Sequence, residues 1–488
     1  MHTRLLQNMP KLLLFLLLLT GCTYDKKEIE ADTQNYPPQI ANIILNKCAT
    51  SGCHNESSYS NADGILMSNY ANLFKGSDHG AVIIPFRPDQ SSLLFFTNTY
   101  KDLGLMAAPT MPLYGTPLSR EEIKTLQDWI GKGAPDAKGN LYYPDDINRA
   151  KIYVSNQGCD IVYVLDAATR LPMRAIDVGK SPAIEAPHQV KISPDGQYWY
   201  AVFYQGTVLQ QFSTANDMLL RTYEIGSGGW STVALSADNK MAYVMDLNTG
   251  KIAFLDLETG SYSYLTKMAN PHGCVLVNND KTLYVSAQTG NFLYKIDVSD
   301  PSAPVYKQIS LDGKPISYLS SIDPHEVLFS SDQSRYYVTC QKSNDVRIFN
   351  TSNDSLIGSV KTGIFPQEMA YSKKQNLLFV TCTDDSLNAP VGTKGTVTVI
   401  DISSMSALTT LYGFYQPHGI ACDDASGLVY VANRNVSPSG PAPHHASACG
   451  GRNGFMQLID PSTLKTIGNY KVELSTDPYS MVYHPGKL

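Results

Sequence analysis

The sequence predicts a mostly β protein, in which a small all-α domain is followed by a seven-bladed β-propeller closed by its own N- and C-terminal strands. One observation behind the propeller is a unit of about 40 residues with four strands, which recurs from residue 151 onward. A second is that incomplete units at the two ends of this segment complement each other. The all-α domain is predicted by the helical spacing of apolar residues within 39–136.

Residues 1–21 have the pattern of a secretory signal peptide. Arg4 and Lys11 accompany an apolar run over residues 12–19, and small residues follow before Cys22. The run is far shorter than the about 20 residues of a membrane-spanning helix. Residues 19–22, Leu-Thr-Gly-Cys, resemble a bacterial lipobox, which implies cleavage before Cys22 and lipidation of that cysteine. The alternative is an ordinary signal peptide with a chance cysteine.

This leader places the mature protein outside the cytoplasm. We expect lipid anchoring in the periplasm, at the outer membrane or at the cell surface, with the lipid as the sole membrane contact. Residues 22–38 are polar and charged and are expected to form a tether. The chain has 38 Lys and Arg residues against 44 Asp and Glu residues, so its net charge of −6 offers no basic footprint for nucleic acid.

In residues 39–136, two predicted helices enclose a middle rich in loops. The first carries apolar residues over 40–45 and runs into Cys48. The second follows a capping box formed by Ser119 and Glu122, and glycines from Gly131 onward end it.

Cys48, Cys53 and His54 form a CxxxxCH sequence between these helices. Outside the cytoplasm, two cysteines followed at once by a histidine suggest covalent haem, because thioethers fix the porphyrin and the adjacent imidazole reaches its iron. The usual spacing is CxxCH, so the longer spacing weakens the motif when it is taken alone. The alternative is a Cys48–Cys53 disulfide beside an uninvolved His54.

The whole segment resembles the small cytochrome c domains of exported bacterial lipoproteins. The matching landmarks are the helix before Cys48 and residues 64–66, 73–76, 84–85, 91–93, 111–112 and 129–135. The resemblance implies haem c bound covalently through Cys48 and Cys53, with His54 as the proximal and Met111 as the distal iron ligand. A thioether opposite an imidazole raises the reduction potential, which suits single-electron transfer. Met106 and His79 are alternative distal ligands.

Residues 151–488 are expected to form the propeller, after a linker at 137–150. Within each unit a short strand and a polar turn precede a second strand that often ends in Tyr-Val. Six complete units begin at Pro187, Gly229, Pro271, Pro324, Pro366 and Pro417.

The remaining strands complete a seventh blade. Residues 151–179 supply the last three strands of a unit, and residues 477–483 supply a first strand. Joining them closes the ring and removes exposed sheet edges. Phrases such as those at 283–285 and 429–433 resemble the YVTN family of propeller repeats.

The innermost strands begin around one mouth of the central channel. The residues expected there are His188, Trp230, His272, His325, Gln367, His418 and Tyr479. Two insertions, at 384–396 and 435–453, are expected on the same face, and the second contains His444 and His445. Six histidines on one surface predict a site for copper or a second haem. The alternatives are an organic ligand held by neutral imidazoles, and histidines that only line a water-filled channel.

The other cysteines are expected to be mostly small buried apolar residues. Cys159 and Cys449 lie in loops of the histidine-bearing face, where either could be a soft metal ligand.

Two enzyme families resemble this arrangement in part. The cytochrome cd1 nitrite reductases share the order of a c-type haem domain before a propeller, but their propeller has eight blades. The nitrous oxide reductases share seven blades and a histidine-rich copper cluster, but their Asp-x-His-His-x-His signature is missing because Ala446 and Ser447 follow His445. Neither resemblance transfers a reaction to this chain.

We therefore expect electron transfer outside the cytoplasm, in which the propeller provides a docking surface or a second redox site. The partner would be a redox protein or a small redox substrate. One alternative is an oxidoreductase with copper or a second haem at the histidine-rich face. Another is a non-catalytic lipoprotein that binds a protein or a glycan. Whether the chain is an enzyme stays open. No phosphate-binding loop, nucleophile elbow or zinc-finger spacing is present, so a hydrolase activity has no starting residue.

Overall fold

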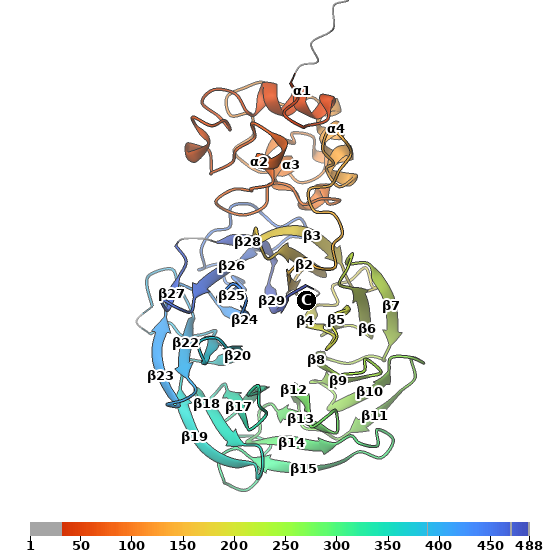
Figure 1. Cartoon of the computed structure of the whole chain (residues 1–488), viewed down its shortest axis with the longest axis vertical. Coiled ribbons are helices and arrows are strands. Elements are labelled where there is room, and N and C mark those ends of the chain that lie inside the picture. Colours follow the sequence, from red (N-terminus) through yellow and green to blue (C-terminus); the bar gives the residue numbers. More distant parts are fainter. Residues whose placement is uncertain (1–31, 388, 469–470, 487–488) are drawn as a thin grey trace, which may run out of the picture.

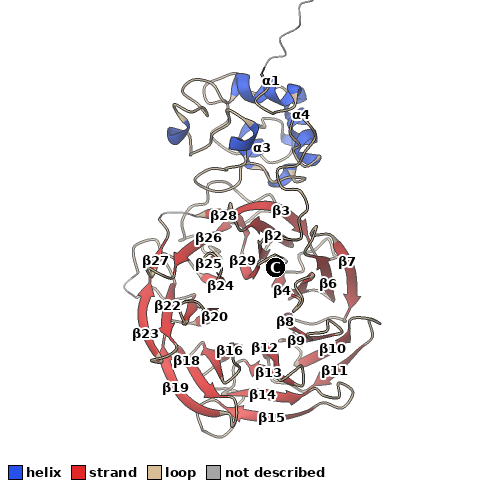
Figure 2. Ribbon diagram, in the orientation of Figure 1, coloured by secondary structure: helices blue, strands red, loops and turns tan. Residues whose placement is uncertain are grey.

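The computed structural model describes residues 32–387, 389–468 and 471–486, so the predicted signal peptide and Cys22 lie outside the described residues. A helical region at the N-terminal end lies beside a ring of sheets (Figures 1 and 2), and the ring contains seven sheets. Within the described ranges, no helix is long and apolar enough to cross a membrane.

The helical region has four α-helices and three short 3-10 helices. In chain order these are α1 (Pro38–Lys47), η1 (Tyr59–Asn61), α2 (Tyr70–Leu73), η2 (Pro88–Gln90), α3 (Ser92–Thr97), η3 (Lys101–Leu103) and α4 (Arg120–Gly131).

The predicted terminal helices, α1 and α4, pack against each other. The capping box of α4 is confirmed, since the Ser119 side chain accepts from the Glu122 N–H while the Glu122 carboxylate accepts from the Ser119 N–H. Trp129 on α4 donates from its indole nitrogen to the Pro135 carbonyl at 2.8 Å. Tyr36 is fully buried against these helices and donates to the Met67 and Asn69 carbonyls, so packing begins before residue 39.

The seven-bladed propeller is confirmed as seven antiparallel sheets. The closing blade consists of β29 (Pro478–His484), β1 (Lys151–Asn156), β2 (Ile161–Asp166) and β3 (Leu171–Asp177). The next blade consists of β4 (Pro187–Ile192), β5 (Tyr198–Phe203), β6 (Val208–Ser213) and β7 (Leu219–Glu224). It is followed by the blade of β8 (Trp230–Leu235), β9 (Met241–Asp246), β10 (Lys251–Asp256) and β11 (Tyr262–Thr266). The blade after that consists of β12 (Pro271–Val277), β13 (Thr282–Ala287), β14 (Phe292–Asp297) and β15 (Val305–Ser310).

The fifth blade consists of β16 (Pro324–Phe329), β17 (Arg335–Cys340), β18 (Asp345–Asn350) and β19 (Ser355–Lys361). The sixth consists of β20 (Pro366–Ser372), β21 (Leu377–Cys382), β22 (Thr396–Asp401) and β23 (Ser406–Leu411). The last consists of β24 (Pro417–Asp423), β25 (Leu428–Asn433), β26 (Asn453–Asp460) and β27 (Lys465–Thr466), and β28 (Val472–Thr476) also pairs with β26. The predicted insertions therefore separate β21 from β22 and β25 from β26.

The ring closes by pairing its last strand with its first. β29 and β1 are antiparallel, with Lys151 opposite His484 and Val154 opposite Met481. Next to this seam, Lys151 is 1% exposed, and its Nζ lies 2.8 Å from a carboxylate oxygen of Asp217. The other Asp217 oxygen accepts from the Tyr153 hydroxyl at 2.8 Å. A fully paired buried charge therefore links the closing blade to the loop between β6 and β7.

Residues 137–150, the predicted linker, contact both regions, and on the propeller side Arg174 donates to the Tyr143 carbonyl at 2.7 Å. Tyr142 stacks on Phe74 at 4.4 Å between ring centroids, and Tyr143 is 3% exposed. On the propeller side, Arg87 donates to the Ala175 carbonyl at 2.7 Å and to Asp177 at 2.9 Å. The helical region thus packs against the outer side of the ring, away from its centre (Figure 1).

Candidate functional site

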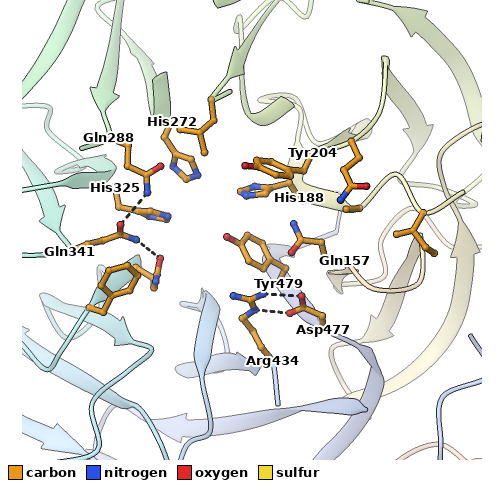
Figure 3. Close-up of a pocket in the computed structure, with 16 residues that line it drawn as sticks. Gln157, His188, Tyr204, His272, Gln288, His325, Gln341, Arg434, Asp477 and Tyr479 are labelled. Atoms are coloured by element: carbon orange, nitrogen blue, oxygen red, sulfur yellow. Dashed lines mark hydrogen bonds and ion pairs between the residues drawn. The ribbon is translucent and has the colours of Figure 1, made fainter. Parts of the chain in front are cut away.

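Four histidines and a tyrosine form a closed circle of aromatic rings around the central channel. The neighbouring ring centroids lie 5.5 Å apart for His188–His272, 4.2 Å for His272–His325, 5.8 Å for His325–His418, 3.8 Å for His418–Tyr479 and 4.5 Å for Tyr479–His188. We call these five residues the histidine circle. Four of them, all except His418, line a cavity of about 480 Å³. Figure 3 shows the side chains around this cavity.

A repeated backbone feature brings the histidines to this place. Each follows the proline that opens its innermost strand, and the pairing register with the second strand shifts directly afterwards, as in a β-bulge. The residue before each proline has a left-handed backbone, with φ of 58° at Ala186, 39° at Asn270, 59° at Asp323 and 52° at Gln416. Bulges redirect side chains, so one local design repeated around the ring turns several imidazoles toward the channel.

Hydroxyl groups of the preceding blade fix the backbone of this circle. Ser286 donates to the His325 carbonyl at 2.7 Å, and Thr381 donates to the His418 carbonyl at 2.7 Å. Thr232 donates to the His272 carbonyl in the same way. These bonds hold the main chain and leave the imidazole rings free for other partners.

Burial keeps the four imidazoles neutral. His188, His272, His325 and His418 are all at most 6% exposed. Desolvation lowers the pKa of His272 to about 4 and that of His418 to about 3, with further lowering by His418 and by Arg434 respectively. Desolvation, followed by the neighbouring histidines, also depresses the pKa of His188 and His325 well below the ordinary value.

Several of these nitrogens are without partners. Within the described part of the chain, Nδ1 of His272, Nδ1 of His325 and Nε2 of His418 are buried and have no hydrogen-bond partner. His418 Nδ1 lies 3.0 Å from the Tyr479 carbonyl, which is a natural acceptor for its proton. Buried polar atoms normally find partners, so these nitrogens beside a cavity are free to bond a water or a ligand.

Two glutamates follow channel residues on their strands, and sequence reasoning missed them. Desolvation raises the pKa of Glu368 to about 8, and desolvation together with Glu368 raises that of Glu326 well above the ordinary value. Lys191 opposes both shifts. Glu368 Oε1 lies 3.5 Å from His418 Nδ1, so a protonated carboxyl adjoins the histidine circle at neutral pH. The signal was available, because Glu326 and Glu368 directly follow His325 and Gln367.

Polar side chains complete the cavity wall. Arg434 forms a bidentate pair with Asp477, at 2.6 and 2.9 Å, and its guanidinium carbon lies 4.7 Å from the centre of the Tyr479 ring. Gln288 donates to Gln341 at 3.1 Å, and Gln341 donates to Gln367 at 2.8 Å (Figure 3). The cavity therefore offers neutral donors and acceptors with one paired cation, which suits a small polar or anionic ligand.

Of the seven residues predicted around the mouth, five line this cavity, and Trp230 and His418 do not. The Trp230 indole nitrogen donates to the Gly226 carbonyl at 2.8 Å, and its ring packs with Tyr264 and under Lys251. Trp230 is fully buried between blades and has a packing role.

The expectation that six histidines share one surface is wrong for His444 and His445. They line a second cavity of about 30 Å³ with His79 and Glu473, and none of its described lining residues belongs to the channel cavity. His445 also contacts Phe95 on α3 at 5.1 Å between ring centroids. The insertion thus turns toward the helical region, which a propeller repeat alone could not reveal.

The imidazole nitrogens of the histidine circle do not lie close enough together for three of them to bind a single ion. Among the described residues, three metal-ligating atoms lie within 4.8 Å of one another in one group, which consists of Asp63, His79 and His444. The circle could bind a metal or the iron of a second haem through one or two imidazoles, of which His272 and His325 are the closest pair.

Cys159 and Cys449 are paired in a disulfide, with their Cα atoms 5.8 Å apart. The suggestion that either is a free metal ligand is therefore wrong. The bond ties the 435–453 insertion to the turn between β1 and β2. Cys340 and Cys382 are buried free thiols, as expected, whereas Cys274 and Cys422 are half-buried.

The predicted haem residues lie around the loop after α1. Cys48 is buried and Cys53 half-buried, and both are free thiols among the described residues, so the structure does not form the alternative Cys48–Cys53 disulfide. His54 Nδ1 lies 3.2 Å from the Ile65 carbonyl, which accepts its proton. This bond leaves Nε2 of His54 as the lone-pair nitrogen, as an iron-ligating imidazole requires.

The candidate distal ligands differ in their surroundings. Met111 is half-buried, and its N–H donates to the Phe96 carbonyl at 2.7 Å. Met106 is 48% exposed. His79 lies 3.1 Å from Asp63 and stacks on His444 at the junction with the propeller.

Comparison with models of known families and with curated proteins finds no match. Solved structures do share the fold. Hydrazine synthase of Kuenenia stuttgartiensis is 15% identical with a TM-score of 0.51, over 64% of this chain and 93% of that chain. A functionally unknown protein of Desulfotomaculum acetoxidans is 13% identical with a TM-score of 0.53, over 68% and 98%. The dihydro-heme d1 dehydrogenase NirN, in complex with DHE, is 14% identical with a TM-score of 0.50, over 84% and 95%.

Proposed function

We propose that this chain is an exported, lipid-anchored c-type cytochrome fused to a seven-bladed propeller, and that it transfers electrons outside the cytoplasm. Cys48 and Cys53 would hold the haem covalently, His54 and Met111 would ligate its iron, and Cys22 would carry the lipid. The histidine-lined face of the propeller would receive a redox partner or a small redox substrate.

The observation that carries this proposal is the state of His54. Its Nδ1 is held by the Ile65 carbonyl at 3.2 Å, and two free cysteines precede it in the chain. A carbonyl on Nδ1 fixes both the tautomer and the orientation of an iron-ligating imidazole. Haem bound there would supply a one-electron carrier whose potential is raised by a thioether ligand.

Two further observations support the proposal. The Cys159–Cys449 disulfide fits an oxidising compartment, since such bonds are rare in the cytosol. The similar structure of NirN is named as a dehydrogenase of a dihydro-heme, and its match covers more of this chain than residues 151–488 contain. The likeness therefore extends beyond the propeller.

The role of Met111 can be tested by redox titration of the haem-loaded protein. Replacing Met111 with alanine should lower the reduction potential, because the thioether that favours ferrous iron is lost. Met106→Ala is the matched control, since Met106 is exposed, and it should leave the potential unchanged. Equal reduction potentials for wild type and Met111→Ala would mean that Met111 is not an iron ligand.

A second candidate function is an oxidoreductase with its substrate or second cofactor in the channel. The orphaned nitrogens of His272, His325 and His418 favour it. Reductions of small substrates consume protons, and the Glu368 carboxyl, whose pKa is raised to about 8 by desolvation, lies 3.5 Å from His418 and could supply them.

This candidate is tested by metal and haem content after incubation with copper or with haem. Replacing His188, His272, His325 and His418 together should abolish any haem bound beyond the c-type haem and should lower the copper content below that of wild type. Unchanged content in that variant would refute a cofactor in the channel.

A further inference from the structure

Three side chains with metal-ligating atoms meet where the helical region contacts the propeller. Asp63 and His79 belong to the helical region, and His444 belongs to the insertion between β25 and β26. His79 Nε2 lies 3.1 Å from Asp63 Oδ1, and His444 Nε2 lies 3.7 Å from Asp63 Oδ2. The two imidazoles stack with centroids 4.4 Å apart and an interplanar angle of 13°. All three ligating atoms lie within 4.8 Å of one another.

The contacts within this group are incomplete without a cation. Asp63 Oδ2 is shielded from solvent and has no hydrogen-bond partner among the residues that the structure describes. Its 3.7 Å separation from His444 Nε2 is too long for a hydrogen bond. It is close to the about 3.3 Å between neighbouring ligands of a tetrahedral zinc ion with bonds of about 2.0–2.1 Å.

The helical region holds its two ligands in place through backbone contacts. The Asp63 carbonyl accepts from the Asp78 N–H at 3.0 Å, and Ser77 Oγ accepts from the His79 N–H at 3.1 Å. Gly64 has a φ of +69°, and a Cβ there would lie 2.7 Å from Asp78 Oδ1, so glycine permits this close approach. The loop carrying Asp63 is thereby fixed against the segment carrying His79.

On the propeller side, several contacts fix the third ligand, His444. A carboxylate oxygen of Glu473 accepts from the His444 N–H, and the other lies 3.2 Å from His445 Nδ1. Asn453 donates to the His445 carbonyl at 3.1 Å, and the Cys159–Cys449 disulfide fastens the far end of the loop. Because the loop is fixed before any ion arrives, little ordering opposes binding.

There is also room for a fourth ligand. A cavity of about 30 Å³ adjoins His79 and His444. A cavity of this size accommodates a single water molecule. Two imidazoles, a carboxylate and one water form a common set around zinc and similar divalent ions.

We propose that Asp63, His79 and His444 bind a divalent transition-metal ion of the zinc type, and that this ion fastens the helical region to the propeller. The site lies apart from the histidine circle. It is also independent of the proposed electron transfer, since it uses none of Cys48, Cys53, His54 and Met111.

The probe is Zn²⁺ alone, added to chelator-treated, haem-loaded protein. Calorimetry should show one tight site per chain, and zinc X-ray absorption should show two imidazoles with oxygen ligands and no sulfur. Asp63→Asn and His444→Ala should each weaken this site by at least about 100-fold, more than the loss of an outer partner costs. Zinc should also slow hydrogen exchange at the Glu473 N–H, which donates to the His79 carbonyl across the junction at 2.8 Å.

Asp102→Asn is the matched control, because Asp102 is a carboxylate of the helical region that pairs with Arg120 at 2.7 Å and is not part of the junction group; it should bind zinc like wild type. Circular dichroism verifies folding, and Asp63→Asn, which preserves side-chain size, decides the matter if His444→Ala fails to fold. The proposal is overturned if wild type binds no zinc, if both junction variants bind as tightly as wild type, or if Asp102→Asn loses the site instead.

Discussion

Replacing His325 with phenylalanine should make the protein more stable while it impairs the channel. The imidazole is 3% exposed, and its Nδ1 has no partner among the described residues. A buried polar atom without a partner costs about 1–3 kcal/mol, and phenylalanine has a similar shape without that atom. We therefore expect the free energy of unfolding to rise by about 1–3 kcal/mol.

His484→Phe is the matched control for this experiment. His484 is also 3% exposed, but its Nε2 lies 2.8 Å from the Gly196 carbonyl and its Nδ1 accepts from the Gly486 N–H at 3.1 Å. Phenylalanine would leave both partners without a hydrogen bond, so the free energy of unfolding of this variant should fall by about 1–3 kcal/mol.

Urea unfolding followed by far-ultraviolet circular dichroism measures both effects, provided that the slope with denaturant stays constant. Destabilisation of His325→Phe by as much as His484→Phe would refute the reasoning. It would mean that His325 is a satisfied structural residue, and that the cavity owes nothing to orphaned imidazoles.

Three further variants test other parts of the structure. Asp217→Asn leaves the buried Lys151 charge uncompensated and should lower the free energy of unfolding in urea by about 3–5 kcal/mol. Glu224→Gln, in the exposed pair with Lys180, should lower it by less than about 1 kcal/mol. Equal losses in the two variants would contradict this expectation. Glu368, with its pKa raised to about 8 by desolvation, stays protonated in the folded protein, so wild type should lose stability as pH rises from about 5 through about 8. Glu368→Gln should reduce that loss in thermal unfolding at several pH values, with Glu326 accounting for the remainder, and parallel pH profiles would refute the role of Glu368. Cys449→Ser should speed tryptic cleavage after Arg452, because the insertion loses its disulfide. Cys422→Ser, which replaces a free thiol, should leave the cleavage rate unchanged. Similar rates in wild type and both variants would mean that the disulfide does not hold the loop.

The propeller was predictable because its information is local and repeated. Turn residues and strand pairs recur in each unit, and the partial units at 151–179 and 477–483 required the β29–β1 pairing that the structure contains. The histidine circle was predictable for the same reason, since one bulge occurs in the same phase of several blades.

The remaining features depend on contacts between segments that are distant in the chain. His444 meets Asp63 because the helical region packs on the outer side of the ring, and no repeat encodes that docking. The Cys159–Cys449 bond joins a turn to an insertion 290 residues away, so spacing could not reveal it. Trp230 occupies the same slot as the histidines, but its large side chain is buried between blades instead of facing the cavity.

Covalent haem is tested most directly by the intact mass and iron content of the mature chain produced with haem-attachment machinery. Wild type should contain one iron atom per chain and have a mass increased by one covalent haem, and the variant with serine at both Cys48 and Cys53 should show neither. Absence of covalent haem from wild type, or its persistence in the double variant, would rule out haem attachment at these two cysteines.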